Sequence, residues 1–143
     1  MRSAFVDALC DAAGSDPSIW LLTADLGFSV LEPFMERFPD RFVNVGVAEQ
    51  NMIGVAAGLA LAGKTVVTYS IVNFATLRCL EQIRNDICYH RANVKIVALA
   101  LASPMAPKDI PTTESKILLS WPRFPNLMWW FPAIRSKQGW QRN

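Results

Sequence analysis

Apolar and polar residues alternate with two different periods along the first hundred positions of the chain. Stretches with apolar residues at helical spacing predict helices, and short, almost wholly apolar runs predict strands. The predicted helices span residues 3–13, 31–38, 49–62 and 74–89, and the predicted strands span 19–23, 42–45, 65–70 and 94–101. Strands that alternate with helices form a parallel sheet with helices on both faces. We therefore expect an α/β protein whose ligands bind beyond the carboxyl ends of its strands.

The predicted helix at 49–62 has an unusual distribution of charge. Its first residue, Glu49, is the only charged residue between positions 48 and 62, where the remaining residues are mostly small and apolar. A helix N-terminus stabilises an acid through its dipole, so a first-turn acid on a buried helix explains Glu49 without any function. The strand-like residues before Glu49 and the two polar residues after it favour a functional acid. Gly54 and Gly58 are expected to let another backbone come close.

Three side chains fall at or just after the ends of predicted strands. Asp25 follows the strand at 19–23, Glu49 follows the strand at 42–45, and Phe74 follows the strand at 65–70. Asp25 is equally well explained as a residue that caps a turn, and Phe74 as a core aromatic at a helix start. For the charged residues between positions 78 and 86 we expect surface or interface salt bridges and no catalytic role.

Four segments carry a family resemblance in their order and spacing. They are TADLGFS (23–29), RFVNVGVAEQNMIGVAAGLALAGK (41–64), TYSIVNFATLRCLEQIRND (68–86) and ANVKIVA (92–98). Together they resemble the pyrimidine-binding domain of thiamine-diphosphate enzymes, in particular transketolase and its C-terminal subunits. The resemblance covers residues 2–101 and implies the same parallel α/β fold, which it leaves incomplete at the C-terminus.

The resemblance also implies roles for the three side chains. The family's Gly-x-Ala-Glu-Gln acid hydrogen-bonds N1′ of the cofactor's aminopyrimidine, and this position is Glu49. A carboxyl group kept away from water can shuttle the proton that prepares the thiazolium for attack on a substrate carbonyl. By the same resemblance Phe74 stacks on the aminopyrimidine, and Asp25 lies near the cofactor channel at a subunit interface. No metal ligand is implied in this chain.

The segment Gly-Asp-Gly…Asn, which holds Mg²⁺ and the diphosphate in this family, is not among the motifs. The resemblance therefore implies that this chain binds only the pyrimidine end of thiamine diphosphate. An N-terminal transketolase-type subunit would hold Mg²⁺ in a dimer or other homo- or hetero-oligomer. The implied activity is transfer of two-carbon ketol units between sugar phosphates, with no turnover by the chain alone. Alternatives are a subunit of a 1-deoxyxylulose-5-phosphate synthase, a 2-oxoacid dehydrogenase beta subunit, and a non-catalytic remnant.

Composition argues against several classes of protein and site. The net charge of +2 does not indicate nucleic-acid binding. The three cysteines are widely spaced and fit neither a disulfide framework nor a zinc site, which indicates a reducing compartment. The first residues include acids and do not fit a signal peptide, and no apolar run approaches the length of a membrane helix. We expect a cytoplasmic protein that binds neither nucleic acid nor membrane.

The tail departs from the pattern, so we divide the chain into a truncated domain at 1–102 and an aberrant tail at 103–143. The tail holds six of the nine prolines and four of the five tryptophans, without a clean period. Met and Trp each have one codon, so Met128–Phe131 must read Val-Val-Val when translated one base earlier. Similar shifts permit the family's Thr-His-His turn and its Val-Val-x-Pro-x-Asp-Pro run. This pattern predicts a frameshifted translation, with a divergent but selected tail as the alternative.

Overall fold

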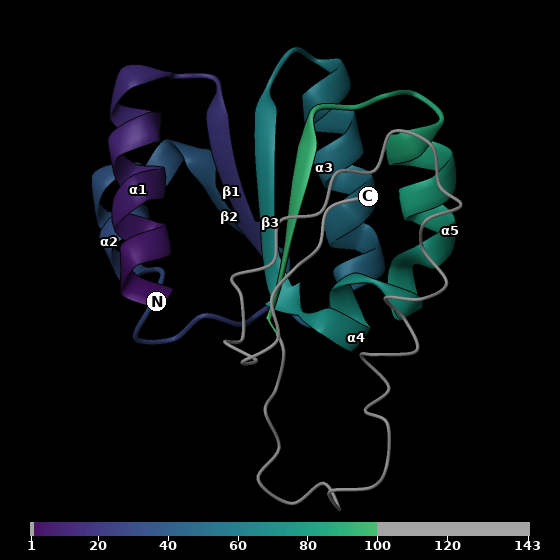
Figure 1. Ribbon diagram of the computed structural model, residues 1–143, viewed down its shortest axis with the longest axis horizontal. Coiled ribbons are helices and arrows are strands. Elements are labelled where there is room, and N and C mark those ends of the chain that lie inside the picture. The colour runs from purple at the N-terminus through teal and green to yellow at the C-terminus, as the bar shows by residue number, and fades with distance from the viewer. Residues whose placement is uncertain (1, 100–143) are drawn as a thin grey trace, which may run out of the picture.

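The computed structural model describes residues 2–99, in which helices and strands alternate as the sequence predicts (Figure 1). The strands are β1 (Ile19–Thr23), β2 (Phe42–Asn44), β3 (Thr65–Ile71) and β4 (Val94–Leu99). The α-helices are α1 (Arg2–Ser15), α2 (Glu32–Arg37), α3 (Glu49–Leu61), α4 (Val72–Ala75) and α5 (Leu80–Gln82). Shorter turns of other helix types are η1 (Pro39–Arg41), η2 (Leu77–Cys79) and η3 (Ile83–Cys88), of which η3 is a π-helix.

All strand pairs are parallel and form one sheet in the order β2-β1-β3-β4. Helices α1 and α2 cover one face, and α3 and α5 cover the other (Figure 1). The carboxyl ends of the strands lie at one edge, where α4 follows β3 directly. The predicted parallel α/β architecture is confirmed.

The sheet separates two apolar cores. Leu22, Met52 and Ile53 pack between the sheet and α3, whereas Leu21, Phe34 and Tyr69 pack on the α1 and α2 side. Neighbouring residues of one strand enter opposite cores because successive side chains of a strand point to opposite faces. Both faces of β1 and β3 are buried, which explains why β1 is almost continuously apolar and why β3 contains no charged residue.

The predicted single helix at 74–89 is wrong. Helix α4 begins at Val72 and ends at Ala75, after which the chain passes through η2, α5 and η3. Thr76 lies at the break, and its hydroxyl as well as its backbone N–H donates a hydrogen bond to the carbonyl oxygen of Val72. A threonine that bonds back to the preceding turn competes with regular helix geometry and bends the chain.

Other boundaries differ from the predictions by one or two residues. Elements α2 (Glu32–Arg37), β2 (Phe42–Asn44) and α3 (Glu49–Leu61) are shorter than predicted, and α1 (Arg2–Ser15) and β3 (Thr65–Ile71) are longer. Strand β4 is described to Leu99, so the predicted end of this strand at residue 101 lies outside the described residues. The predicted domain boundary after residue 102, the incomplete C-terminus and the tail at 103–143 also lie outside them.

Candidate cofactor-binding site at the carboxyl edge of the sheet

The structure places Asp25, Glu49 and Phe74 at the carboxyl edge of the sheet, in the segments that follow β1, β2 and β3. Parallel strands bring these segments to one edge although they are far apart in sequence. The three side chains differ in exposure: Glu49 is buried, Phe74 is half-buried and Asp25 is exposed.

Glu49 opens α3 and has only 1% of its surface exposed. Its N-cap residue, Ala48, supplies no side-chain hydrogen bond to the helix end. The Glu49 carboxylate instead accepts hydrogen bonds from two distant residues: Ser70 Oγ lies 3.4 Å from Oε1, and an Arg78 guanidinium nitrogen lies 2.7 Å from Oε2. A buried carboxylate is tolerated only when such partners replace its water. Glu49 is therefore more than a solvated first-turn acid.

Arg78 is the residue that sequence reasoning missed. We expected its segment to form surface or interface salt bridges, but Arg78 pairs with the buried acid while its side chain stays 43% exposed. Its guanidinium also lies over the ring of Phe74, 4.1 Å from the ring centroid. Phe74 belongs to α4 and Arg78 to η2, on either side of the break at Thr76, so helical spacing in the sequence did not indicate this contact.

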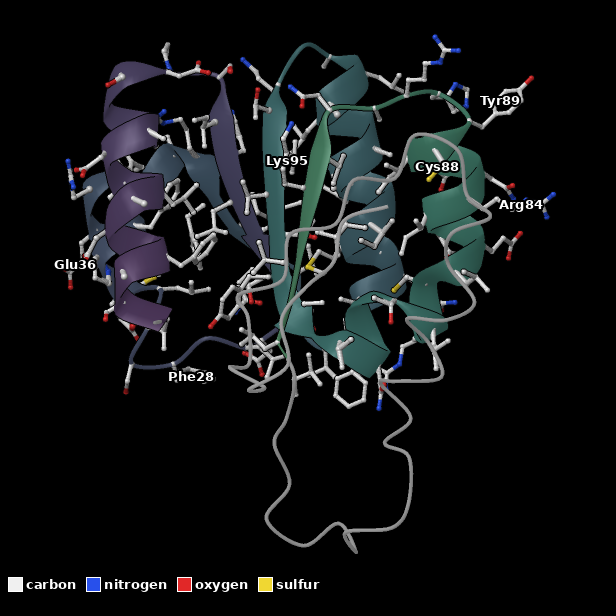
Figure 2. The ribbon with its side chains drawn as sticks, viewed as in Figure 1. Phe28, Glu36, Arg84, Cys88, Tyr89 and Lys95 are labelled. Atoms are coloured by element: carbon white, nitrogen blue, oxygen red, sulfur yellow. The ribbon has the colours of Figure 1, made fainter. Side chains whose placement is uncertain are left out.

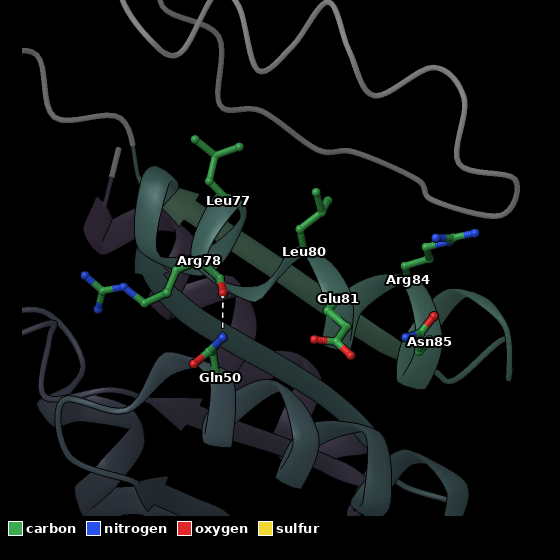
Figure 3. A pocket seen from close by; sticks show the side chains of 7 residues that line it. All are labelled: Gln50, Leu77, Arg78, Leu80, Glu81, Arg84 and Asn85. Atoms are coloured by element: carbon green, nitrogen blue, oxygen red, sulfur yellow. Dashed lines mark hydrogen bonds between the residues drawn. The ribbon is translucent and has the colours of Figure 1, made fainter.

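Gln50 fixes the backbone that carries Arg78. The Gln50 side-chain amide donates a 3.0 Å hydrogen bond to the Arg78 carbonyl oxygen, joining the first turn of α3 to η2 (Figure 3). Beside this bond lies an open cavity of about 490 Å³. Its lining is mixed apolar and charged and consists of Gln50, Leu77, Arg78, Leu80, Glu81, Arg84 and Asn85.

Asp25 shapes the loop after β1. It has a left-handed backbone (φ 55°), and its N–H donates a 2.9 Å hydrogen bond to Asn44 Oδ1. The Asn44 amide nitrogen lies 3.4 Å from the Asp25 carboxylate, and Asn44 Oδ1 also accepts from the Gly46 N–H at 3.0 Å. Asn44 thus ties the ends of β1 and β2 to the loop that leads into Glu49. The side chain that caps this loop is therefore that of Asn44, and Asp25 takes part through its backbone N–H and one longer contact of its carboxylate.

Cys79 lies close to the acid but is not suited to be a nucleophile. Its thiol is buried and donates a 3.1 Å hydrogen bond to the Phe74 carbonyl oxygen. Burial, aided by the nearby charge of Glu49 and opposed by Arg78, raises the pKa of the Cys79 thiol to about 11. Because the thiolate is the reactive form, Cys79 is inert at neutral pH.

Two exposed apolar side chains belong to the loops at this edge. Phe28 follows β1 and is 77% exposed (Figure 2). Val47 precedes α3 and is 76% exposed. Within residues 2–99 no cluster of three His, Cys, Asp or Glu side chains is arranged to hold a metal ion. None of the helices described is long and apolar enough to cross a membrane.

The fold and the site define an open parallel α/β protein with a buried acid at its carboxyl edge, linked through an arginine to an aromatic ring. Residues 1–134 match the family model described as "Transketolase, pyrimidine binding domain". The chain belongs to this family, and membership implies the use of thiamine diphosphate.

Relatives of the chain include separate transketolase subunits. The chain is 46% identical over 99 residues to the "Putative transketolase C-terminal section" of Methanocaldococcus jannaschii, covering 68% of this chain and 31% of that protein. It is 44% identical over 98 residues to a 6-deoxy-6-sulfo-D-fructose transketolase subunit of a Clostridium species, covering 68% and 30%. It is also 36% identical over 135 residues to "1-deoxy-D-xylulose-5-phosphate synthase" of Desulfitobacterium hafniense, covering 93% and 21%.

A solved structure described as "Split gene transketolase, inactive beta4 tetramer" has the same fold. It superposes with a TM-score of 0.63 and is 46% identical, over 68% of this chain and 33% of that one. The chain thus spans between a fifth and a third of the length of these relatives.

Proposed function

We propose that this chain is the pyrimidine-binding subunit of a split transketolase-like enzyme that transfers two-carbon ketol units between sugar phosphates. The observation that carries the proposal is the buried Glu49 carboxylate, which opens α3 at the carboxyl edge of the sheet and is linked through Arg78 to the ring of Phe74. The family match and the separate transketolase subunits among its relatives support it.

The residues present fit the aminopyrimidine end of the cofactor. Glu49 would hold and transfer a proton at N1′, since its carboxyl group is shielded from water. Ser70 donates to Oε1 and keeps the carboxyl group oriented, and the half-buried ring of Phe74 offers a face for stacking. When bound, thiamine diphosphate supplies the thiazolium carbon that attacks the substrate carbonyl. Asp25 would act indirectly, by holding the loop beside the cofactor channel through Asn44.

A partner subunit would complete the site. We propose that it carries the Gly-Asp-Gly…Asn segment, which would hold Mg²⁺ and the diphosphate, in a homo- or hetero-oligomer. The solved relative is described as an inactive tetramer of beta subunits, which supports a need for a second type of chain. Exposed Phe28 and Val47 at the site edge offer apolar surface for such a partner. The three cysteines are all free, which supports a reducing, cytoplasmic location.

A second candidate is a subunit with 1-deoxyxylulose-5-phosphate synthase activity. The alignment to the Desulfitobacterium synthase is longer than the transketolase alignments, at 135 residues against 98 and 99, but its identity is lower. Both activities use the same proton transfer at Glu49, so they differ in substrate and not in the chemistry proposed for this chain.

The test is a ketol-transfer assay with thiamine diphosphate and Mg²⁺. The purified chain alone should show no turnover, and addition of a candidate subunit bearing Gly-Asp-Gly…Asn should restore it. Replacing the sugar-phosphate pair by pyruvate and glyceraldehyde 3-phosphate separates the second candidate from the first. Turnover by the chain alone would contradict the need for a partner. Failure with every partner tested, in a complex that assembles, would identify a non-catalytic remnant.

A further inference from the structure

Arg78 makes two contacts within this chain that a bound aminopyrimidine ring would also need. Its guanidinium donates a 2.7 Å hydrogen bond to the buried Glu49 carboxylate, and it lies 4.1 Å from the centre of the Phe74 ring. A guanidinium is planar, carries several N–H donors and stacks on aromatic faces. Under the proposed function, an aminopyrimidine would use the same carboxyl group through N1′ and the same ring by stacking.

We infer that Arg78 and the aminopyrimidine compete for Glu49 and Phe74, so that cofactor binding requires the Arg78 side chain to leave the acid. The inference rests on the proposed function, because it takes Glu49 and Phe74 as the pyrimidine-binding residues. It goes further by assigning to this chain a displaceable internal ligand for its own site.

Solvent and a neighbouring cavity offer alternative positions for the Arg78 side chain. Its side chain is 43% exposed, whereas Glu49 is 1% exposed, so the arginine can swing into solvent while the acid cannot. The neighbouring cavity of about 490 Å³ is lined by Glu81, a second carboxylate three residues further along the chain. In Figure 3 the Arg78 side chain extends away from Glu81, so rotation about its side-chain bonds would exchange one carboxylate for the other. Gln50 would hold the Arg78 backbone in place during this movement.

The competition predicts how affinity for the ring depends on charge at position 78. Arg78→Met keeps an apolar chain of similar length but removes the ion pair and the planar cation. Loss of a half-exposed ion pair and a cation–π contact from the free protein should tighten ring binding by about tenfold. Arg78→Lys keeps the charge and loses the planar guanidinium. The affinity of this variant for the aminopyrimidine ring should therefore fall between those of wild type and Arg78→Met. Glu81→Gln removes the alternative counter-ion and should weaken binding by about twofold.

The experiment is an NMR titration of the full-length chain with 4-amino-5-hydroxymethyl-2-methylpyrimidine, which is the ring without thiazolium or diphosphate. Wild type, Arg78→Met, Arg78→Lys and Glu49→Gln are compared. Arg84→Met is the matched control, because Arg84 lines the same cavity and is not a partner of Glu49. The expected order of affinity is Arg78→Met, then Arg78→Lys, then wild type and Arg84→Met together, with Glu49→Gln weakest.

The outcomes separate the inference from the proposed function. Equal or weaker ring binding by Arg78→Met, with binding still lost in Glu49→Gln, overturns the competition and leaves the proposed site intact. Ring binding that is unchanged in Glu49→Gln overturns the proposed site itself. Absence of binding by folded Arg78→Met also overturns the competition, since the variant removes the competing group. Arg78→Lys provides the same comparison with wild type if Arg78→Met fails to fold.

Discussion

The Arg78 guanidinium lies 2.7 Å from the Glu49 carboxylate and reaches it from 29 positions further along the chain. Glu49 is at the N-terminus of α3 and Arg78 is in η2, so the pair joins the two segments that follow β2 and β3. The acid is buried and the arginine half-exposed, and this asymmetry decides what each substitution should do.

Glu49→Gln should leave folding nearly unchanged and lower turnover of the assembled enzyme by at least about a hundredfold. Glutamine keeps the shape of the side chain, and the Arg78 charge left behind can be solvated, so the free energy of unfolding should change by no more than about 1 kcal/mol. Urea unfolding and the ketol-transfer assay with the partner subunit measure the two effects. Wild-type turnover by Glu49→Gln would show that Glu49 is only a helix-start acid.

Phe74→Leu should weaken cofactor binding by a factor of about 2–10, because an aromatic face contributes about 0.5–1.5 kcal/mol beyond its buried area. The control is Tyr89→Leu, which removes an 82% exposed aromatic from the far end of the structure (Figure 2). Calorimetric titration of thiamine diphosphate into the assembled enzyme compares the variants. The same loss in both would show that Phe74 contributes only general apolar surface.

Gly54→Ala should stabilise the isolated chain by about 0.5–1 kcal/mol, because alanine is the better helix former. The close backbone approach that we expected at Gly54 and Gly58 is not made within the described residues: a Cβ at either glycine would meet none of their atoms within 4 Å. If a partner subunit makes this approach, Gly54→Ala should weaken assembly while raising the melting temperature.

Gly14→Ala is the matched control for that experiment. Gly14 lies in α1, where an added Cβ would come no nearer than 3.9 Å to Arg37. The Gly14→Ala variant should have a higher melting temperature than wild type. Its assembly with the partner, measured by analytical ultracentrifugation, should be unchanged. Unchanged assembly in Gly54→Ala would exclude this face of α3 from the interface.

The stability of the chain should fall in alkali through Cys79. The pKa of its buried thiol is raised from 9.0 to about 11, so the unfolded chain loses this proton at lower pH than the native chain. The contribution is fully present below pH 9 and is lost as the pH rises toward 11; at most it is about 2–3 kcal/mol. Urea unfolding across this range should show a steeper decline for wild type than for Cys79→Ala. Parallel curves would contradict the raised pKa.

The coding DNA should contain a frameshifting insertion or deletion near the codon for residue 103. Restoring the frame should give an uninterrupted extension with a Thr-His-His turn, because the codons of Met128–Phe131 already read Val-Val-Val one base earlier. Sequencing of the gene is the measurement. A restored frame that lacks the Thr-His-His turn would identify the tail as selected divergence.

Much of the fold follows from local patterns in the sequence. The run Ile19–Thr23 is apolar or β-branched throughout, and Thr65–Ile71 contains no charged residue, because both faces of their strands are buried. The sequence also predicted that Glu49 begins a helix, because an acid that precedes a long uncharged apolar run is typical of the first turn of a helix. Both features depend on residues close together in the chain.

The sequence by itself determined the order of strands and helices, the parallel sheet and the edge at which Asp25, Glu49 and Phe74 gather. The tertiary structure decided which groups surround the acid: Ser70 and Arg78 reach Glu49 from 21 and 29 positions away. It also decided the break after α4, where the Thr76 hydroxyl bonds back to Val72. Periodicity reports which face of an element is buried, but the partner of a buried charge depends on how separate elements pack, which only the folded chain fixes.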